Sequence, residues 1–434
     1  MSYDETIQYL FNLQFHGIQP GLDRIRSLLS LLGDPHLRFP SVHIGGTNGK
    51  GSTSAMVAAM LQQAGYRVGL YTSPHLIDFS ERITINGIPI PKEEVVRMTD
   101  QLKTVIDAAK IRITFFEFIT AMAFCFFAEA VDIAVVEVGL GGRFDATNVL
   151  MPLVTAITQI DFDHERYLGA TILEIAKEKA GIIKEKTPVI TGAKQTEVLA
   201  LFEEVAASHH APLFQLGRDM TVSGNSPDSL LYRGISERII SCPLLGKHQM
   251  DNAGVALRII EALQPAHCAA TIDPFPISEN DIMEGMRRVK WPGRLQMIQT
   301  DPMILLDGAH NQAGAHALAN YLQGVDPSRL GKHFVMIGIL REKNIRQMLS
   351  LIAPWADEIV LTRPDIERAA DPSELYALLE EPIPTTVQKT VADAISYVEA
   401  RLKPNDTLVI TGSLYTVGEA LAYLKGVTLS PIRG

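Results

Sequence analysis

Cysteine is scarce in this chain, and no segment is long and apolar enough to suggest a membrane span. Three of the 434 residues are cysteine, and they lie far apart, at Cys125, Cys242 and Cys268. No two of them have CxxC spacing, and they provide no disulfide framework, which fits a reducing cytosol. The most apolar run, residues 118–128, lies between two glutamates and is too short to cross a bilayer.

Signals for export and for nucleic-acid binding are missing as well. The first residues, Met-Ser-Tyr-Asp-Glu, lack the basic start and apolar core of a signal peptide. The 39 lysines and arginines are outnumbered by 49 aspartates and glutamates, which gives a net charge of −10, and no long basic run occurs. We therefore expect a cytoplasmic protein without nucleic-acid or membrane partners. A hydrophobic content of 47% is that of a globular protein with a buried core.

The pattern of elements favours an α/β fold. Strand-like and helix-like segments alternate from residue 41 to residue 191, and the run at 132–138 is rich enough in valine for a strand buried on both faces. Asn86-Gly87 predicts a tight hairpin within residues 81–90. Such alternation predicts a doubly wound, mostly parallel sheet. Short runs with turn residues at about 213–243 predict a small antiparallel β-patch.

A second alternation of strands and helices follows the break signal Trp291-Pro292-Gly293. It runs from the apolar segment at 303–306 to a strand at 407–410 and a helix at 415–424. At roughly 150 residues per domain the length allows two or three domains. We expect two, residues 1–295 and a Rossmann-like α/β domain at 296–434.

The sharpest motif is a glycine-rich loop between a predicted strand and a predicted helix. Glycines let backbone N–H groups approach an anion, the helix N-terminus favours negative charge, and a lysine reaches the outer phosphates of a nucleotide. The loop departs from the strict GxxxxGK[ST] pattern, because Ile44 replaces the first glycine and Gly51 intervenes before the hydroxyl. The alternative is a glycine turn with a surface lysine. The candidate ATP-binding residues are Gly46, Thr47, Asn48, Gly49, Lys50, Gly51 and Ser52.

Polar residues at the ends of predicted strands are candidates for binding the Mg²⁺ that accompanies a nucleotide triphosphate. Ser73, Glu137 and His164 each follow or end such a strand, and open α/β sheets place ligands at that edge. Glu137 is the strongest of them, because a buried carboxylate without a cation is costly. Taken alone, a serine after a strand such as Ser73 is more often a cap, and His164 fits a loop histidine as well as a ligand.

Taken together, the motifs resemble those of the folylpolyglutamate synthase and dihydrofolate synthase family of the Mur ligase superfamily. Gly-Thr-Asn-Gly-Lys-Gly-Ser at 46–52 resembles the ATP loop of that superfamily. The other matching segments follow in order over almost the whole chain: 70–75, 114–118, 137–148, 163–165 with 168–169, 178–184, 246–249 with 252–253, 291–294, 307–311 and 411–415.

The resemblance implies a two-domain ligase that activates a carboxylate with ATP and couples it to the amine of L-glutamate through an acyl phosphate. It makes Ser73, Glu137 and His164 the Mg²⁺ ligands and implies two Mg²⁺ ions, with no organic redox cofactor. Lys179 matches a lysine that is carbamylated in related enzymes, although its helix position alone favours a solvated lysine. The remaining implied roles are ATP contacts for Asn252, Arg294 and Asp307, and contacts to the acyl phosphate and glutamate for His310 and Ser413. Arg294 is alternatively an interdomain salt bridge.

Further segments resemble the pteroate-binding elements of the family. They are Leu22, Asp23, Arg24 and Ile25, then Thr114, Phe115, Phe116 and Glu117, and finally Arg143, Phe144, Asp145 and Ala146. The Gly-Leu-Asp-Arg form at 21–24 is similar to that of members that accept dihydropteroate, which favours a bifunctional enzyme acting on 7,8-dihydropteroate and on reduced folates. The alternative for Asp23 and Arg24 is a plain helix cap.

Three other functions compete with the bifunctional ligase. One is a folylpolyglutamate synthase without the first activity. A Mur-type ligase for a UDP-linked precursor is less favoured, because only about 44 residues precede the ATP loop, too few for the UDP-binding domain that such enzymes generally carry. A P-loop kinase or nucleotide switch would not need the second βα domain with Asp-Gly-Ala-His-Asn at 307–311. The family resemblance also suggests a monomer.

Overall fold

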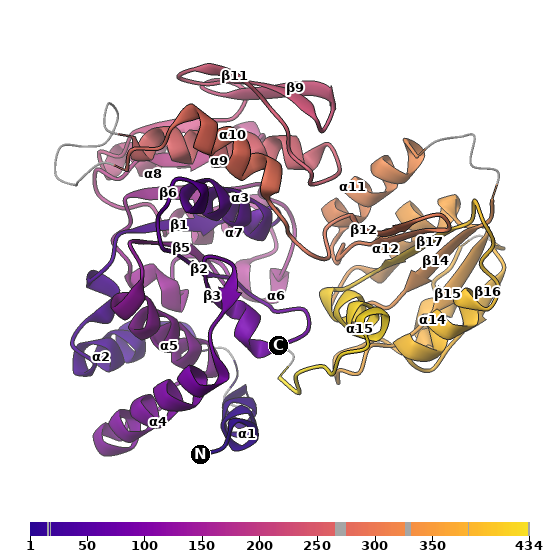
Figure 1. Cartoon of the computed structure of the whole chain (residues 1–434), viewed down its shortest axis with the longest axis horizontal. Coiled ribbons are helices and arrows are strands. Elements are labelled where there is room, and N and C mark those ends of the chain that lie inside the picture. The colour runs from indigo at the N-terminus through magenta and orange to yellow at the C-terminus, as the bar shows by residue number, and fades with distance from the viewer. Residues whose placement is uncertain (15–16, 18, 265–274, 326–330, 381, 433–434) are drawn as a thin grey trace.

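The computed structural model of the chain describes residues 1–14, 17, 19–264, 275–325, 331–380 and 382–432. Cys268 lies outside these residues, whereas Cys125 and Cys242 are buried free thiols. Within the described ranges, no helix combines the length and apolar character needed to span a bilayer. The chain forms a larger N-terminal part and a smaller C-terminal part, each built around its own sheet (Figure 1).

An eight-stranded sheet organises the described N-terminal part, in the order β4-β3-β2-β5-β1-β6-β7-β8. All neighbours from β2 to β8 pair in parallel, and β3 and β4 add an antiparallel edge. The predicted hairpin is confirmed, since Asn86 and Gly87 join β3 to β4 with φ of 50° and 74°. The strands are β1 Ser41–Gly45, β2 Val68–Tyr71, β3 Ile83–Ile85, β4 Ile88–Pro89, β5 Ile133–Glu137, β6 Val154–Ile157, β7 Val189–Thr191 and β8 Leu213–Gln215.

Helices cover both faces of this sheet, because its central strands are apolar on both sides. In β5, Ile133 and Val135 pack into one core with α3, α9 and α10, while Ala134 and Val136 pack into another with α1, α2, α4 and α5. The helices are α1 Tyr3–Leu13, α2 Asp23–Leu31, α3 Lys50–Gln63, α4 Lys92–Ala109, α5 Phe115–Ala130, α6 Glu165–Leu168, α7 Ile172–Ala180, α8 Thr196–Ser208, α9 His248–Leu263 and α10 Glu279–Arg288, with 3-10 turns at Pro35–Leu37, Phe79–Arg82 and Ala146–Val149.

The antiparallel patch is present but smaller than predicted. It consists of β9 Thr221–Ser226, β10 Ser229–Arg233 and β11 Glu237–Ile240. The segment at its predicted start, Leu213–Gln215, instead joins the main sheet as β8, parallel to β7. Three residues are too few for periodicity to separate the two pairings, so only the tertiary packing decides where this strand lies.

A six-stranded sheet forms the described C-terminal part, in the order β12-β13-β17-β14-β15-β16. Only the pairing of β12 with β13 is antiparallel, and helices pack on both faces, as in the predicted Rossmann-like domain. Its elements are β12 Gln296–Thr300, β13 Met303–Leu306, α11 Gln312–Gln323, β14 His333–Ile337, α12 Ile345–Ile352, a 3-10 turn at Ala353–Trp355, β15 Glu358–Leu361, α13 Pro372–Ala377, β16 Thr385–Val387, α14 Val391–Glu399, β17 Thr407–Thr411 and α15 Leu414–Lys425.

The two parts are joined at more than one place. β12 begins at Gln296, and we propose the division 1–295 and 296–434 on that basis. However, the segment after α15 returns to the N-terminal part, where the Ser430 N–H donates to Ile77 O at 2.8 Å and Ile432 is fully buried in the core around α1, α2, α4 and α5. In Figure 1 the yellow segment after α15 runs back toward the N-terminal part.

Candidate active site

The phosphate loop connects β1 to α3 and leaves the N-terminus of α3 open. Gly49 is the N-cap of α3 and offers no side-chain oxygen, so the first N–H groups of this 14-residue helix have no capping side chain. Lys50 folds back over the loop, and its Nζ donates to Gly46 O at 3.2 Å and to Thr47 O at 3.0 Å. A cation and a row of unpaired N–H groups thus converge, as binding of a phosphate chain requires.

Neighbouring elements press so closely on this loop that two of its positions accept only glycine. Gly46 and Gly49 have φ of 134° and 88°. A Cβ on Gly46 would lie 1.9 Å from Thr158 Oγ1, and one on Gly49 would lie 2.2 Å from Asn252 Oδ1. Left-handed backbone and close approach both exclude a side chain here. The contact with Asn252 places α9 directly against the loop, as the predicted ATP contact requires.

The three candidate metal ligands come from the same edge of the N-terminal sheet and line the same pocket as the loop. Glu137 ends β5, Ser73 follows β2, and His164 follows β6. The Ser73 N–H donates to Glu137 Oε2 at 3.4 Å. Burial raises the pKa of Glu137 to about 7, even though the charges of Lys50 and Arg294 oppose the rise. Burial likewise lowers the pKa of His164 to about 4, which leaves a neutral imidazole suited to metal ligation.

These residues fit a divalent cation. The buried Glu137 carboxylate is costly to ionise unless a cation lies beside it. The Ser73 hydroxyl and the His164 imidazole complete a small set of donors for such a cation. The described residues contain no cluster of three or more His, Cys, Asp or Glu side chains in metal-binding arrangement. The cation site therefore depends on a serine oxygen and on the phosphate oxygens of a bound nucleotide as further donors.

Lys179 lies in the last turn of α7 and is buried, so the alternative of a solvated helix lysine is wrong. Its side chain crosses to the phosphate loop, where Nζ donates to Gly46 O at 2.8 Å. Burial, together with the smaller effect of the neighbouring Lys50 charge, lowers its pKa to about 7. The sequence alone does not distinguish Lys179 from the neighbouring Lys177. Only the packing of α7 on the sheet decides that Lys179 is the buried one of the two.

Strand ends of the C-terminal sheet form the opposite wall of the pocket. Asp307 follows β13 and accepts hydrogen bonds from the N–H groups of Leu295 at 2.8 Å and Ala309 at 3.0 Å, so it fixes the turn that presents the next residues. Arg294 and His310 line the pocket with it. The Arg294 guanidinium donates to Gly293 O at 3.1 Å, and its charge acts on both Asp307 and Glu137. On the opposite side, Gln249 of α9 donates to Ser52 Oγ at 3.2 Å.

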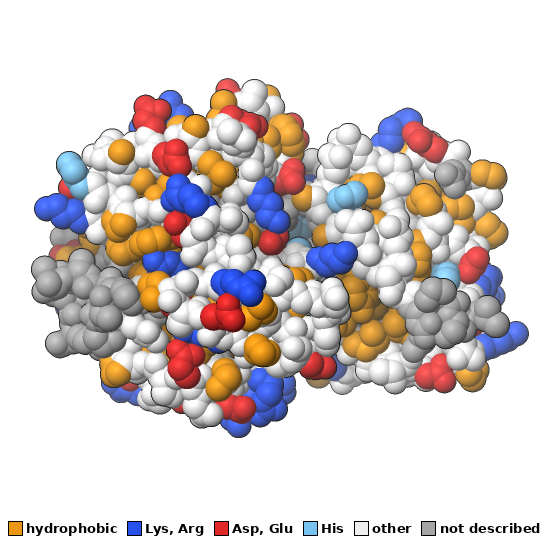
Figure 2. Space-filling model, turned by 90° about the horizontal axis from the view of Figure 1, so that it is seen from above, with side chains coloured by type: hydrophobic (Ala, Val, Ile, Leu, Met, Phe, Trp, Pro, Cys, Tyr) orange, Lys and Arg blue, Asp and Glu red, His pale blue; other side chains and the backbone are white. Residues whose placement is uncertain are grey.

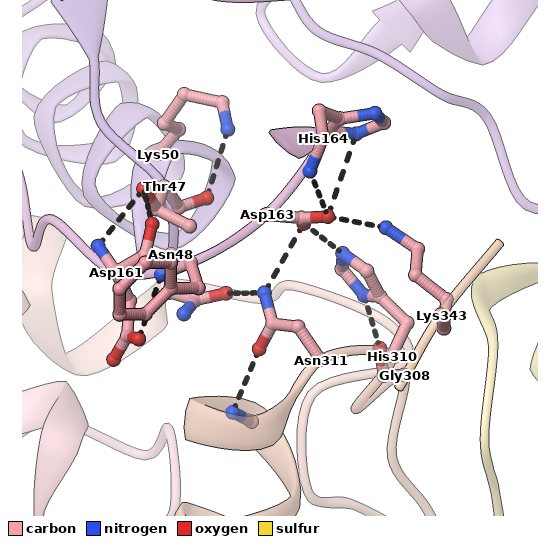
Figure 3. A network of polar contacts seen from close by, with 12 residues as sticks. Thr47, Asn48, Lys50, Asp161, Asp163, His164, Gly308, His310, Asn311 and Lys343 are labelled. Carbon is pink, nitrogen blue, oxygen red and sulfur yellow. Dashed lines mark hydrogen bonds and ion pairs between the residues drawn. The ribbon is translucent and has the colours of Figure 1, made fainter. Parts of the chain in front are cut away.

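Asp163, in the loop after β6, links the two parts across the pocket. Its Oδ2 lies 3.4 Å from His310 Nε2 and accepts a hydrogen bond from Asn311 Nδ2 at 3.2 Å. Its Oδ1 accepts from the His164 N–H at 2.8 Å and pairs with the Lys343 ammonium. Figure 3 shows these side chains pointing toward the Asp163 carboxylate from both parts of the chain. In the space-filling view an indentation at the waist of the molecule marks the boundary between the two lobes (Figure 2).

Comparison with known proteins decides the family. A model of the Mur ligase middle domain matches residues 44–260, and a model of the Mur ligase glutamate ligase domain matches residues 293–414. The dihydrofolate synthase/folylpolyglutamate synthase of Bacillus subtilis is 37% identical over 98% of this chain and 99% of its own length. This chain belongs to the dihydrofolate synthase/folylpolyglutamate synthase family of Mur ligases.

Solved structures of this ligase family agree with the fold. The E. coli FolC in complex with DHPP and ADP superposes with a TM-score of 0.88 at 28% identity, covering 98% of each chain. The bifunctional folylpolyglutamate synthase/dihydrofolate synthase of Yersinia pestis complexed with AMPPNP and a Mn ion superposes with a TM-score of 0.86 at 29% identity, again over 98% of each chain. The predicted Mur-ligase-like architecture of two α/β units is thereby confirmed.

Two segments predicted for the pteroate side of the ligase meet, although they are far apart in sequence. Arg24, at the start of α2, donates through Nε to both carboxylate oxygens of Glu117, at 3.1 and 3.3 Å. Glu117 completes a capping box at the start of α5 with Thr114. The cap of α2 is Leu22, with no side-chain bond, so the plain capping alternative does not describe Arg24.

Several other predicted residues lie away from the pocket lining. Ile25, Phe115 and Ala146 are buried in the core around α2 and α5, whereas Phe144 is exposed. Asp145 is buried and holds its turn, because it accepts hydrogen bonds from the N–H groups of Leu140 and Thr147. For the remaining predicted residues of these segments, Leu22, Asp23, Phe116 and Arg143, no pocket contact is observed.

Ser413 is also absent from the lining of the pocket. It is the N-cap of α15, and its Oγ accepts a hydrogen bond from the Thr416 N–H at 3.0 Å. Leu414 lines the pocket in its place. The predicted role of Ser413 toward glutamate stays a prediction, and a contact with substrate would compete with this cap.

Sequence reasoning did not select three residues that the structure brings into the site. Asp163 and Asn311 lie inside two of the matching segments. Their positions next to His164 and His310 in the sequence could therefore have marked them as candidate site residues. Lys343 lies in the loop between β14 and α12, outside every matching segment, and nothing in its sequence neighbourhood marks it. Only the packing of the two sheets brings it to Asp163.

Proposed function

We propose that this chain is an ATP-dependent ligase that couples L-glutamate both to 7,8-dihydropteroate and to reduced folates. One observation carries this proposal. The phosphate loop, buried Glu137 and Lys179 share one pocket with Arg294 and His310 of the C-terminal part. Such a pocket can hold a triphosphate against a second substrate. The near full-length similarity to a protein named dihydrofolate synthase/folylpolyglutamate synthase supports the choice of substrates.

The proposed reaction has two steps. A carboxylate oxygen of the pteroate or folate attacks the γ-phosphorus of ATP, the bond to ADP breaks, and an acyl phosphate forms. The amine of glutamate then attacks the acyl carbon, and the tetrahedral intermediate loses phosphate and a proton to give the amide. In the first step Lys50 and the open N-terminus of α3 hold the phosphates and stabilise the charge on them. The position of the site between two lobes lets it exclude water, which would hydrolyse the acyl phosphate.

We propose that Ser73, Glu137 and His164 hold one Mg²⁺ of the ligase. When bound, Mg²⁺ would stabilise the negative charge on the oxygens of the phosphate that is transferred. The residues themselves contribute a carboxylate, a hydroxyl and a neutral imidazole from the ends of β5 and β2 and from the loop after β6. The support from relatives is coarser, because the Yersinia pestis structure contains a Mn ion and gives no count of Mg²⁺.

We propose further that Lys179 carries a carbamate, which would support a second Mg²⁺. In carbamylation the neutral amine adds to CO₂ and releases one proton, so that a cation becomes an anionic oxygen ligand. The lowered pKa of Lys179, about 7, supplies the neutral amine that this reaction needs. Its burial beside the loop places the product next to the phosphates.

The C-terminal wall completes the proposed site. Asn252, Arg294 and Asp307 would contact ATP, with Arg294 as the cation nearest both Asp307 and Glu137. His310 would contact the acyl phosphate or glutamate, since its ring faces the pocket from the loop that Asp307 holds. Arg24 and Glu117, together with the segments at 22–25, 114–117 and 143–146, would form the pteroate side.

The second candidate is a folylpolyglutamate synthase that lacks the first activity. Mass analysis of the products from dihydropteroate and from tetrahydrofolate, each with ATP and glutamate, separates the two. We expect a glutamate adduct from both substrates, and ADP release that requires glutamate and the carboxylate together. An adduct from tetrahydrofolate alone would favour the second candidate. ADP release that ignores both substrates would exclude either ligase.

Replacement of Arg24 tests the pteroate side of this proposal. We expect Arg24→Met to lower dihydrofolate formation by about tenfold and glutamate addition to tetrahydrofolate by much less, because the loss of its partly buried charge pair with Glu117 disturbs the pteroate side alone. Arg26→Met is a matched control, because Arg26 is an exposed residue of the same helix. Equal losses in both activities of Arg24→Met would mean that the pair is only structural.

A further inference from the structure

Lys343 and Asp163 form an ion pair that crosses from one part of the ligase to the other. Lys343 lies between β14 and α12, and Asp163 lies 180 residues earlier, in the loop after β6. Both side chains are only 8% exposed. Many other ion pairs of the described chain, such as that between Arg233 and Glu237, are well exposed at both partners. Exposed pairs of that kind contribute little to stability, whereas the loss of one partner of a buried pair leaves an uncompensated charge.

The C-terminal part contributes most of the donors around the Asp163 carboxylate. Lys343 pairs with Oδ1, and His310 and Asn311 face Oδ2 at 3.4 and 3.2 Å. The N-terminal part adds the His164 N–H, at 2.8 Å from Oδ1. The carboxylate therefore fixes the loops after β13 and β14 against the end of β6.

This network reaches the phosphate loop through Asn311. One Nδ2 group of Asn311 donates both to Asp163 Oδ2 and to Asn48 Oδ1, the latter at 3.0 Å. Its Oδ1 caps α11 by accepting from the Gly314 N–H at 2.9 Å. Movement of the loop after β13 would therefore displace Asn48 and His310 together (Figure 3).

We propose that Lys343 is a positioning residue for the ligase reaction, which acts through Asp163. Its ion pair holds the two parts in the register in which His310 faces the phosphate loop. The proposal rests on the function proposed above, because it assigns Lys343 to the alignment of ATP with the second substrate rather than to the binding of either. Reacting groups that are misplaced by about 1 Å lose roughly a hundredfold in rate, whereas nucleotide binding should change less, because Lys50 and the N-terminus of α3 keep their own contacts within the N-terminal part.

The experiment compares Lys343→Met with Lys332→Met. Lys332 is a matched control, because its Nζ pairs with Glu358 at 2.6 Å within the C-terminal part and does not cross the waist. We expect Lys343→Met to lower kcat for glutamate addition by about one hundredfold while the Kd for ADP changes less than about threefold. Lys343→Arg should recover part of the rate, and Lys332→Met should stay within about twofold of the wild type.

A double substitution tests whether Lys343 acts through Asp163. If it does, Asp163→Asn combined with Lys343→Met should be no slower than Asp163→Asn alone, because contacting residues of one network are not additive. Losses that multiply would show that Lys343 acts on a substrate directly and would overturn the proposal. A Lys343→Met enzyme within about threefold of wild-type kcat would overturn it as well.

A structural readout separates this proposal from the proposed function. Small-angle X-ray scattering of the ADP-bound chain should give a larger radius of gyration for Lys343→Met than for the wild type and Lys332→Met. Equal radii for all three, with kcat unchanged, would refute the positioning role alone. A wild-type chain that makes no glutamate adduct would refute the proposed function, whatever the scattering shows.

Discussion

Glu137 and Lys179 show how burial prepares two ordinary side chains for chemistry. Burial penalises the charged form of each, so the pKa of Glu137 rises to about 7 and the pKa of Lys179 falls to about 7. Both line the pocket of the phosphate loop. In the proposed ligase each group would exchange a proton for another partner near neutral pH, which would be a cation for the carboxylate and CO₂ for the amine.

Carbamylation of Lys179 should depend on pH with a midpoint near its pKa of about 7. The protonated amine cannot attack CO₂, so the carbamate should be scarce at pH 6 and reach a plateau above pH 8. Carbon-13 NMR with labelled bicarbonate measures the carbamate signal. We expect the signal to vanish in Lys179→Gln and to persist in Lys177→Gln, the control from the same helix. A signal that survives in Lys179→Gln would place the carbamate elsewhere.

Binding of a divalent cation should weaken as the pH falls below about 7, because Glu137 must lose its proton to act as a ligand. We expect the Kd for Mn²⁺, measured by electron paramagnetic resonance in the presence of ADP, to rise about tenfold per pH unit on the acid side. Glu137→Gln should bind weakly at every pH. Glu129→Gln, at an exposed site, should behave like the wild type, and an unchanged pH profile in Glu137→Gln would contradict the assignment.

At the scale of elements, the local sequence predicts the strand–loop–helix unit from β1 to α3. The local sequence does not predict how closely this unit packs against α9. The apolar strand, the glycines and the helix are visible in the sequence. The reason for Gly49 lies in α9, about two hundred residues later, where Asn252 occupies the space that a Cβ would need. The same distinction explains β8, whose three residues pair with the main sheet although the local pattern resembled the antiparallel patch.

Gly49→Ala should therefore impair nucleotide binding, because an added Cβ would collide with Asn252 in addition to straining the backbone. Gly65→Ala is a matched control, because Gly65 has φ of 92° and no atom within 4 Å of an added Cβ. Both substitutions should lower the free energy of unfolding by about 1–2 kcal/mol through strain at positive φ. Only Gly49→Ala should also raise the KM for ATP, by about tenfold or more. Equal KM values for the two variants would contradict a role for the contact with Asn252.

At the scale of the whole molecule, the chain connects the two sheets at both the beginning and the end of the C-terminal part. The chain leaves the N-terminal part at residues 289–295 and returns after α15, where Ile432 enters the core around α1 and α5. Asp163 and Lys343 add a polar contact near the middle. The net charge of −10 does not prevent anion binding, because the cations Lys50 and Arg294 act locally within the pocket.

The returning tail should contribute measurably to stability. Ile432→Ala should lower the free energy of unfolding by about 2–4 kcal/mol, as expected for a large aliphatic side chain removed from a core. Val427→Ala is the control from the same segment, where the side chain is 49% exposed, and should cost less than about 0.5 kcal/mol. Urea unfolding measures both. A loss for Ile432→Ala no larger than the control would mean that the tail does not dock in solution.

The sequence by itself determined the fold class, the phosphate loop and the family, because these depend on local periodicity, on glycine at defined positions and on motifs kept in order along the chain. It also placed Ser73, Glu137 and His164 near one another, through the rule that ligands gather at strand ends, whereas Lys179 was assigned to the site only through the family resemblance. Only the tertiary structure decided that Lys179 is buried, that Arg24 meets Glu117, and that Lys343 pairs with Asp163. The physical reason is that burial and ion pairing here join segments 93 to 180 residues apart, whose packing leaves no periodic or compositional trace in either segment.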